Sequence, residues 1–241
     1  MMKYILAEVF KYKKVKIKFC TIVLFMPTVI SFIIYGFNKK YNSLLLWEGY
    51  LNVILTFLND IVAPIVYGII AAYIFGHEYE TKTMNVMFTY PINRMKILFS
   101  KLACIFYIIA VSLILIFFTS IILGLLLKHE SLSMDLFIYY FVSFLKMIVF
   151  HFMLVCIICA VAICTKSVLP SIIFVISATF ANIVVVNSNL SAFYPWSAPV
   201  LLSPHEGVGR TYIPSTLSMI SLIAIFLIGI AISIKKYRYV E

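Results

Sequence analysis

Residues 97–127 read ILFSKLACIFYIIAVSLILIFFTSIILGLLL, an apolar run typical of a membrane-spanning helix. About 20 apolar residues cross a bilayer as a helix, and this longer run holds one charged side chain, Lys101. The other apolar runs are Phe19–Phe37, Leu51–Phe75, Leu136–Thr165, Val168–Asn187 and Ile213–Ile234. None shows the polar–apolar alternation of a membrane barrel strand. We predict an all-α polytopic membrane protein with six transmembrane helices, forming a single domain over residues 1–241.

The composition supports the same class. The chain is 64% hydrophobic and 12% charged, whereas soluble domains carry roughly 25% charged residues. Little sequence remains for a folded aqueous domain, so any function that needs one must come from a partner chain. The net charge of +10 is explained by the distribution of basic residues at helix ends, and no nucleic-acid partner is expected.

Basic residues predict the orientation of the spans, because they gather on the cytoplasmic side of membrane proteins. One side of the predicted topology carries 14 of them and the other carries four: Lys39, Lys40, Lys128 and Arg210. This bias places both termini in the cytoplasm.

Two segments outside the spans have their own character. Residues 1–18 hold apolar side chains on one side of a helical wheel and six lysines. They fit either a cytoplasmic helix lying in the membrane interface or a simple basic flank. The external segment 188–212 contains Pro195, Pro199 and Pro204 beside aromatic residues, which predicts a partly re-entrant or interfacial loop.

The predicted cytoplasmic connection 77–96 reads HEYETKTMNVMFTYPINRMK. Thr83 can cap a short helix, and Pro91 ends it. Met84, Met87 and Phe88 share one face of that helix. A short amphipathic helix at the surface fits a groove on another protein, or it lies flat on lipid.

This connection resembles the first cytoplasmic loop of the permease subunits of type-2 ABC exporters. That loop carries a Glu, a Thr and then Pro-x-x-Arg before the third span. Here the pattern is occupied by Glu78, Thr83, Pro91-Ile92-Asn93-Arg94 and Lys101, while Lys82 replaces a Gly common before the Thr. The layout of the whole chain is also similar. Length and the Tyr194–Ser197 stretch are most similar to the small permeases of bacitracin-type and lantibiotic self-immunity exporters.

The resemblance implies a division of labour. The permease pairs with a second permease, identical or different, and with two copies of a cytoplasmic ABC ATPase. The loop helix acts as the coupling helix, so Glu78, Thr83, Met84, Met87, Phe88, Pro91 and Arg94 would contact or position the ATPase. The chain itself has no P-loop, G-x-x-x-x-G-K-[ST]. It is expected to be no enzyme, to need no cofactor and to move an amphipathic cargo outward.

Polar residues inside the predicted spans are costly and are therefore candidates for function. Asp60 and Lys146 lie at a similar depth, which suggests an ion pair. Such a pair would serve the transport path or dimer seam, or only fix helix packing. His151 is expected to be a hydrogen-bonded packing residue. The full set of candidates on the second and fourth spans is Asn52, Thr56, Asn59, Asp60 and Lys146.

Enzyme motifs are incomplete. The pairs His77-Glu78, His129-Glu130 and His205-Glu206 start like a zinc-protease H-E-x-x-H but lack its second His. The rival interpretations are a permease for polysaccharide or another small molecule, and a membrane scaffold or sensor without turnover.

Overall fold

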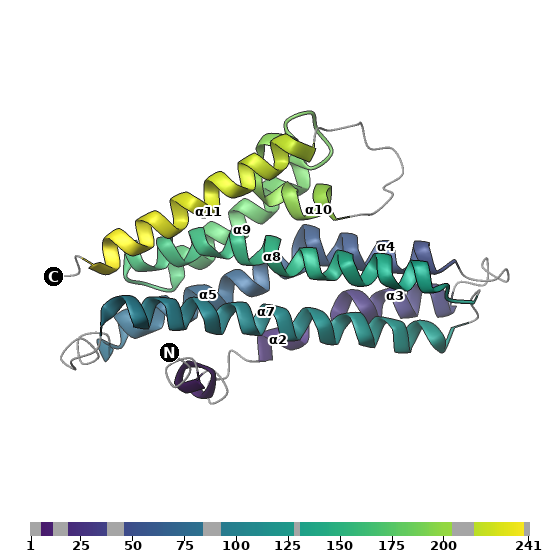
Figure 1. Ribbon diagram of the computed structural model, residues 1–241, viewed down its shortest axis with the longest axis horizontal. Helices are drawn as coiled ribbons and strands as arrows, with labels where there is room; N and C mark the ends of the chain where they lie inside the picture. Colours follow the sequence, from purple (N-terminus) through teal and green to yellow (C-terminus); the bar gives the residue numbers. More distant parts are fainter. Residues whose placement is uncertain are drawn as a thin grey trace.

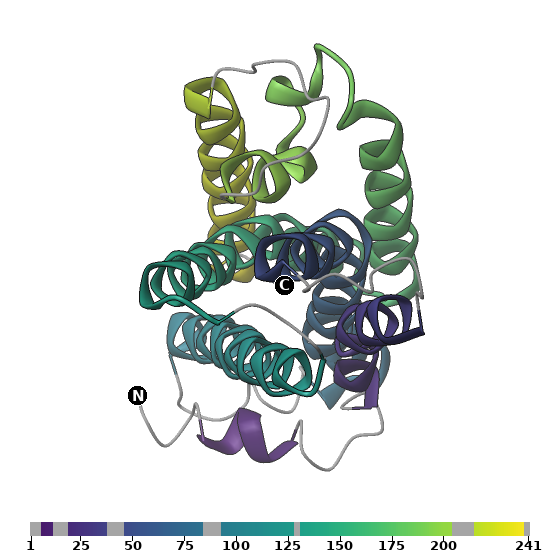
Figure 2. The ribbon, with the colours of Figure 1, turned by 90° about the vertical axis from the view of Figure 1, so that its right-hand side faces the viewer.

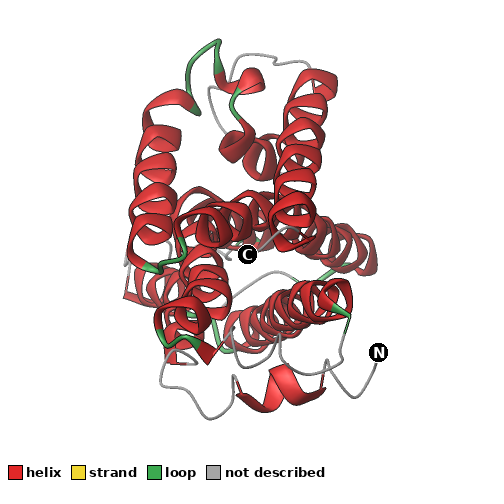
Figure 3. Cartoon of the chain, turned by 90° about the vertical axis from the view of Figure 1, so that its left-hand side faces the viewer, coloured by secondary structure: helices red, strands yellow, loops and turns green. Residues whose placement is uncertain are grey.

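A computed structural model describes residues 6–11, 19–37, 46–83, 93–127, 131–203 and 215–238, and within them the chain contains helices and turns but no strand (Figures 1 and 3). The elements in chain order are α2 (Cys20–Val23), α3 (Met26–Phe37), α4 (Trp47–Phe57), the π-helical turn η3 (Leu58–Val62), α5 (Ala63–Glu80), α7 (Arg94–Leu125), α8 (Met134–Thr165), α9 (Leu169–Val185), η4 (Ser191–Phe193), η5 (Pro195–Ser197), α10 (Ala198–Leu202) and α11 (Ser215–Arg238). Residues 6–11 form a further short helix. The all-α class is confirmed.

Five helical stretches of the described chain are long and apolar enough to cross a membrane: Cys20–Phe37, Trp47–Glu80, Arg94–Leu125, Met134–Thr165 and Thr216–Arg238. The expected span Val168–Asn187 corresponds to α9, whose 17 residues make it shorter than these. The count of six spans therefore stays a prediction.

Helix α8 lies at the centre of the bundle and packs against α5, α7, α9 and α11. Its most apolar stretch is 72% buried, whereas those of the first and last spans are only 22% buried. The peripheral helices expose large apolar side chains, among them Ile33, Phe37 and Leu227. Figure 2 views the molecule end-on and shows α9 and α11 on two flanks of the same side, with α10 between them.

Two glycines set how closely the helices approach α8 and the turn that follows it. A Cβ at Gly229 of α11 would lie 2.7 Å from the Ile157 backbone nitrogen of α8. A Cβ at Gly76 of α5 would lie 2.8 Å from the backbone of Ser167 and Val168. Both contacts are with backbone, which cannot rotate away as a side chain can.

Candidate functional site

The end of α5 carries the first residues of the connection 77–96, and we call this end of the bundle the loop end. The helix ends at Glu80, and Lys82 takes a left-handed conformation with φ 56°. Glycine favours this conformation, and Lys82 stands where the resembled loop commonly has a Gly. The Thr83 hydroxyl donates to the Glu78 carbonyl at 3.2 Å and closes the helix end.

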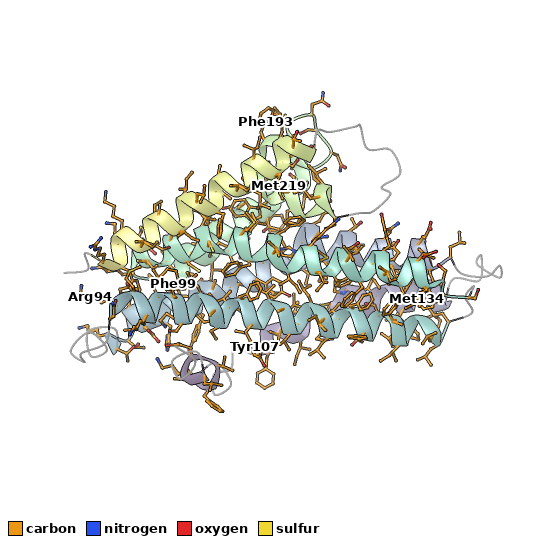
Figure 4. All side chains as sticks on the ribbon, viewed as in Figure 1. Arg94, Phe99, Tyr107, Met134, Phe193 and Met219 are labelled. Atoms are coloured by element: carbon orange, nitrogen blue, oxygen red, sulfur yellow. The ribbon has the colours of Figure 1, made fainter. Side chains whose placement is uncertain are left out.

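Helix α7 begins at the other side of this connection. Asn93 is its N-cap, and its Oδ1 accepts a hydrogen bond from the Met95 backbone at 2.9 Å. Arg94 is therefore the first residue of α7, and Figure 4 shows it at the opposite end of the molecule from Met134, where α8 begins. Met84, Met87, Phe88 and Pro91 lie outside the described residues, so the predicted coupling helix stays a prediction.

A cluster of four charges joins three parts of the chain at the loop end; Lys101, Glu8 and Glu78 are largely buried, and Lys11 is exposed. Lys101 of α7 is fully buried, and its Nζ lies 2.9 Å from Glu78 Oε1 and 3.4 Å from Glu8 Oε2. It also donates to the Ile74 carbonyl at 3.2 Å. Lys11 Nζ lies 3.0 Å from the same Glu78 oxygen and 3.4 Å from Glu8 Oε1. The short helix 6–11 is thereby held against α5 and α7.

The cluster pairs two carboxylates with two ammonium groups, so its net charge is zero, with the exposed Lys11 supplying the second positive charge. Breaking one partner of a buried pair costs about 3–5 kcal/mol, because the other charge is left uncompensated. Partial burial of Lys11 opposes its charge, but the carboxylates of Glu78 and Glu8 outweigh this and raise the pKa of Lys11. Its contribution is present at neutral pH and is lost only as the pH rises through that raised pKa.

A second contact at the loop end joins α5 to the turn between α8 and α9. Glu80 Oε1 accepts hydrogen bonds from the Ser167 hydroxyl at 2.6 Å and from the Val168 backbone at 2.8 Å. A carboxylate at this position satisfies a backbone donor at the start of α9 and matches the positive end of its dipole. The residues leading into the connection thus hold α7, α9 and the short helix 6–11 together.

Two of the predicted intramembrane polar residues, Asn52 and Asn59, make hydrogen bonds at different levels of the bundle. Asn52 Oδ1 accepts from the Tyr140 hydroxyl at 3.0 Å, near the start of α4. Asn59 lies in the π-helical turn, where His151 Nε2 of α8 is 3.0 Å from its Oδ1 and Ser203 is 3.4 Å from its Nδ2. His151 is hydrogen-bonded as expected, and Asn59 connects the middle of the bundle to the end of α10.

The hypothesis of an Asp60–Lys146 ion pair is wrong. Asp60 is half-buried in the π-helical turn, Lys146 is exposed, and no ion pair joins them among the described residues. Lys146 is five residues before His151, which turns it about 140° around α8. Because His151 faces Asn59, Lys146 is directed away from the second span. Thr56 is half-buried on that span.

Glu8, Lys11 and the full burial of Lys101 were not predicted from the sequence. One signal was available, since Glu8 is the only acidic residue among the six lysines of residues 1–18. An isolated carboxylate beside so many lysines is a candidate for an ion pair. No comparable signal marks the contact between Asn59 and His151, because it depends on the π-helical turn.

Two comparisons relate this chain to known proteins. Residues 4–182 match the family described as ABC-2 family transporter protein. The chain is also 29% identical over 175 residues to the bacitracin transport permease protein BCRB of Bacillus licheniformis, an alignment covering 73% of this chain and 83% of that protein. The matched region runs from the helix at residues 6–11 through α9 and includes the charge cluster. The chain therefore belongs to the ABC-2 transporter family, as a membrane-spanning permease subunit of the ABC exporter class.

Proposed function

We propose that this permease works with a separate cytoplasmic ATPase, present in two copies, and with a second permease subunit to export an amphipathic peptide. The family membership supports the ATP-driven mechanism. The relative named for bacitracin transport supports a peptide-antibiotic cargo. The apolar exterior of the spans would give such a cargo a lateral path from the membrane.

The observation that carries the coupling proposal is the position of Glu78. It stands at the start of the connection 77–96, and its carboxylate binds both Lys101 of α7 and Lys11 of the short helix. A push on residues 83–92 would therefore move α5, α7 and residues 6–11 as one body. Met84, Met87 and Phe88 would contact the ATPase, while Thr83, Pro91 and Arg94 would shape the two ends of the connection.

The orientation follows from the charge bias of the sequence. With 14 basic residues on one side, the loop end faces the cytoplasm, where an ATPase can reach it. Six spans require α9 to cross as well, with residues 188–203 closing the external end. The turns η4 and η5 and the short α10 fit the proposed re-entrant segment.

The polar residues within the spans receive different roles. Asn52, Thr56, Asn59 and Asp60 lie on the helix Trp47–Glu80, where they would form a polar strip along the transport path. Lys146 is exposed on α8, and a charge facing lipid is expensive. Lys146 would therefore face the second permease subunit at the dimer seam.

Co-expression with the partner ATPase tests the coupling. Phe88→Asp and Met87→Asp should abolish bacitracin-stimulated ATP hydrolysis, because a charge on the docking face prevents seating in an apolar groove. Met134→Asp is the matched control, since Met134 is exposed at the start of α8, at the opposite end of the molecule from Arg94 (Figure 4). Full stimulation in the Phe88 and Met87 variants would reject the coupling helix. If the wild-type permease binds no ATPase, the result would favour a scaffold or sensor.

A further inference from the structure

The stretch from Leu169 to Ser203 contains no Asp, Glu, Lys, Arg or His, yet it buries three hydrogen-bond donors without partners. These are Nδ2 of Asn182, the hydroxyl of Ser191 and Nε1 of Trp196. The side chains are 0%, 0% and 3% exposed, respectively. Buried polar groups in native proteins are nearly always paired, so each unpaired group requires an explanation.

The donors belong to one folded unit. The Ser197 hydroxyl donates to Asn182 Oδ1 at 2.8 Å, so the amide oxygen of Asn182 is used and its NH₂ group is left over. Trp196 directly precedes Ser197 in the chain. Its ring is fixed by Phe174 at a centroid distance of 5.7 Å and by Tyr194 at 5.9 Å.

The unit is also tied to its surroundings. The Tyr194 hydroxyl donates to the Ala178 carbonyl at 2.7 Å, one turn of α9 before Asn182. Ser191 lies in η4, which packs against α11. At the end of α10, Ser203 contacts Asn59 in the π-helical turn of the second span. Movement of the second span can thus reach the segment that holds the donors.

The chemistry of these three donors indicates which kind of ligand they would bind. Phosphate and carboxylate are held preferentially by Arg or Lys, and this stretch has neither. Neutral donors in apolar surroundings suit neutral oxygen acceptors, of which amide carbonyls are the commonest in a peptide. The rings of Phe174, Tyr194 and Trp196 would contact apolar side chains beside those carbonyls.

We propose that Asn182, Ser191 and Trp196 form a binding site for the backbone carbonyl oxygens of an apolar peptide, exposed when the 188–203 segment moves. This site rests on the proposed export function and specifies where the cargo is held. In the present conformation the donors are covered, as expected for a site that opens in only one state of a transport cycle.

Tryptophan fluorescence gives a direct measurement. The chain has two Trp residues, so Trp47→Phe leaves Trp196 as the only reporter. The full-length protein in lipid nanodiscs, titrated with bacitracin, should show a saturable change in Trp196 emission. Adding Ser191→Ala should raise the half-saturating concentration about tenfold, the equivalent of one lost hydrogen bond.

Ser191→Ala is the informative variant because its hydroxyl has no partner in the folded protein. Its removal should leave thermal stability unchanged or raised. Ser188→Ala is the matched control, because the Ser188 hydroxyl donates to the Val185 carbonyl and accepts from the Leu190 backbone. It should weaken the fold locally and leave the half-saturating concentration unchanged. If Ser191→Ala and its parent have the same half-saturating concentration of bacitracin, the proposed site is rejected.

ATP hydrolysis by the complex with the ATPase separates the two proposals. If bacitracin does not stimulate the wild-type complex, the export proposal fails. If it does, and Trp196→Phe and Ser191→Ala keep the wild-type half-maximal concentration, only the site fails. A saturable Trp196 response to inorganic phosphate, with none to bacitracin, would also reject the peptide-carbonyl site.

Discussion

At the scale of single residues, Lys101 has the most demanding environment of the described charges. It is fully buried between Glu78 and Glu8 and lies 5.7 Å from the centre of the Phe75 ring. We predict that Lys101→Met destabilises the protein by about 3–5 kcal/mol, because two buried carboxylates then share only Lys11. Thermal unfolding in detergent, followed by helical circular dichroism, measures the loss.

Two variants control this prediction. Lys96→Met removes an exposed lysine from the first turn of the same helix and should change stability by no more than about 0.5 kcal/mol. The double variant Lys101→Met with Glu78→Gln leaves Glu8 and Lys11 as a balanced pair and should recover much of the loss. If the double variant is less stable than Lys101→Met alone, charge balance is not what holds the cluster together.

Sequence reasoning reached the right residue types at this scale but often missed their partners. Lys101 and Glu78 were both assigned to the loop pattern, but a contact between them was not predicted. Their meeting depends on the packing of α5 against α7. Asp60 and Lys146 were paired by depth alone, and depth says nothing about the direction in which a side chain leaves its helix.

At the scale of elements, the glycines at helix contacts control how α5 and α11 pack. A Cβ at Gly229 would lie 2.7 Å from backbone of α8, and one at Gly76 would lie 2.8 Å from backbone of the turn before α9. We predict that Gly229→Ala and Gly76→Ala each destabilise by about 1–3 kcal/mol through overpacking. Apparent melting temperature in detergent is the measurement.

Gly36→Ala in α3 is the matched control. Its Cβ would meet only a Leu127 side-chain atom at an ordinary 3.4 Å, so the better helix propensity of alanine should keep or raise stability, by up to about 1 kcal/mol. A Gly229→Ala protein as stable as Gly36→Ala would show that α11 can shift away from α8 without cost.

Hydropathy predicted the elements well where their ends are apolar. The run Leu136–Thr165 corresponds to α8, Met134–Thr165, within two residues. The run Leu51–Phe75 was too short, because the helix continues from Trp47 to Glu80 through polar ends that hydropathy does not detect. The π-helical turn Leu58–Val62 carries no sequence signature, although it directs Asn59 toward His151.

At the scale of the whole molecule, the sequence predicted the all-α class but not the central position of α8. Most runs are similarly apolar, so hydropathy cannot separate a helix that packs against four others from one that faces lipid. The small residues of α8, such as Cys156, Cys159 and Ala160, are all buried. Such residues favour close helix contact in membranes, and they were the available signal.

Whether α9 crosses the membrane decides between five and six spans. Cys164 is exposed near the end of α8, and Asn189 is exposed beyond the other end of α9. In intact cells, a membrane-impermeant maleimide should label Asn189→Cys in a Cys164→Ser background, whereas native Cys164 should react only after permeabilisation. Because 17 helical residues extend about 25 Å, the short span fits if flanking residues or local thinning compensate. Labelling of both positions from the same side would place α9 within one leaflet and return the count to five.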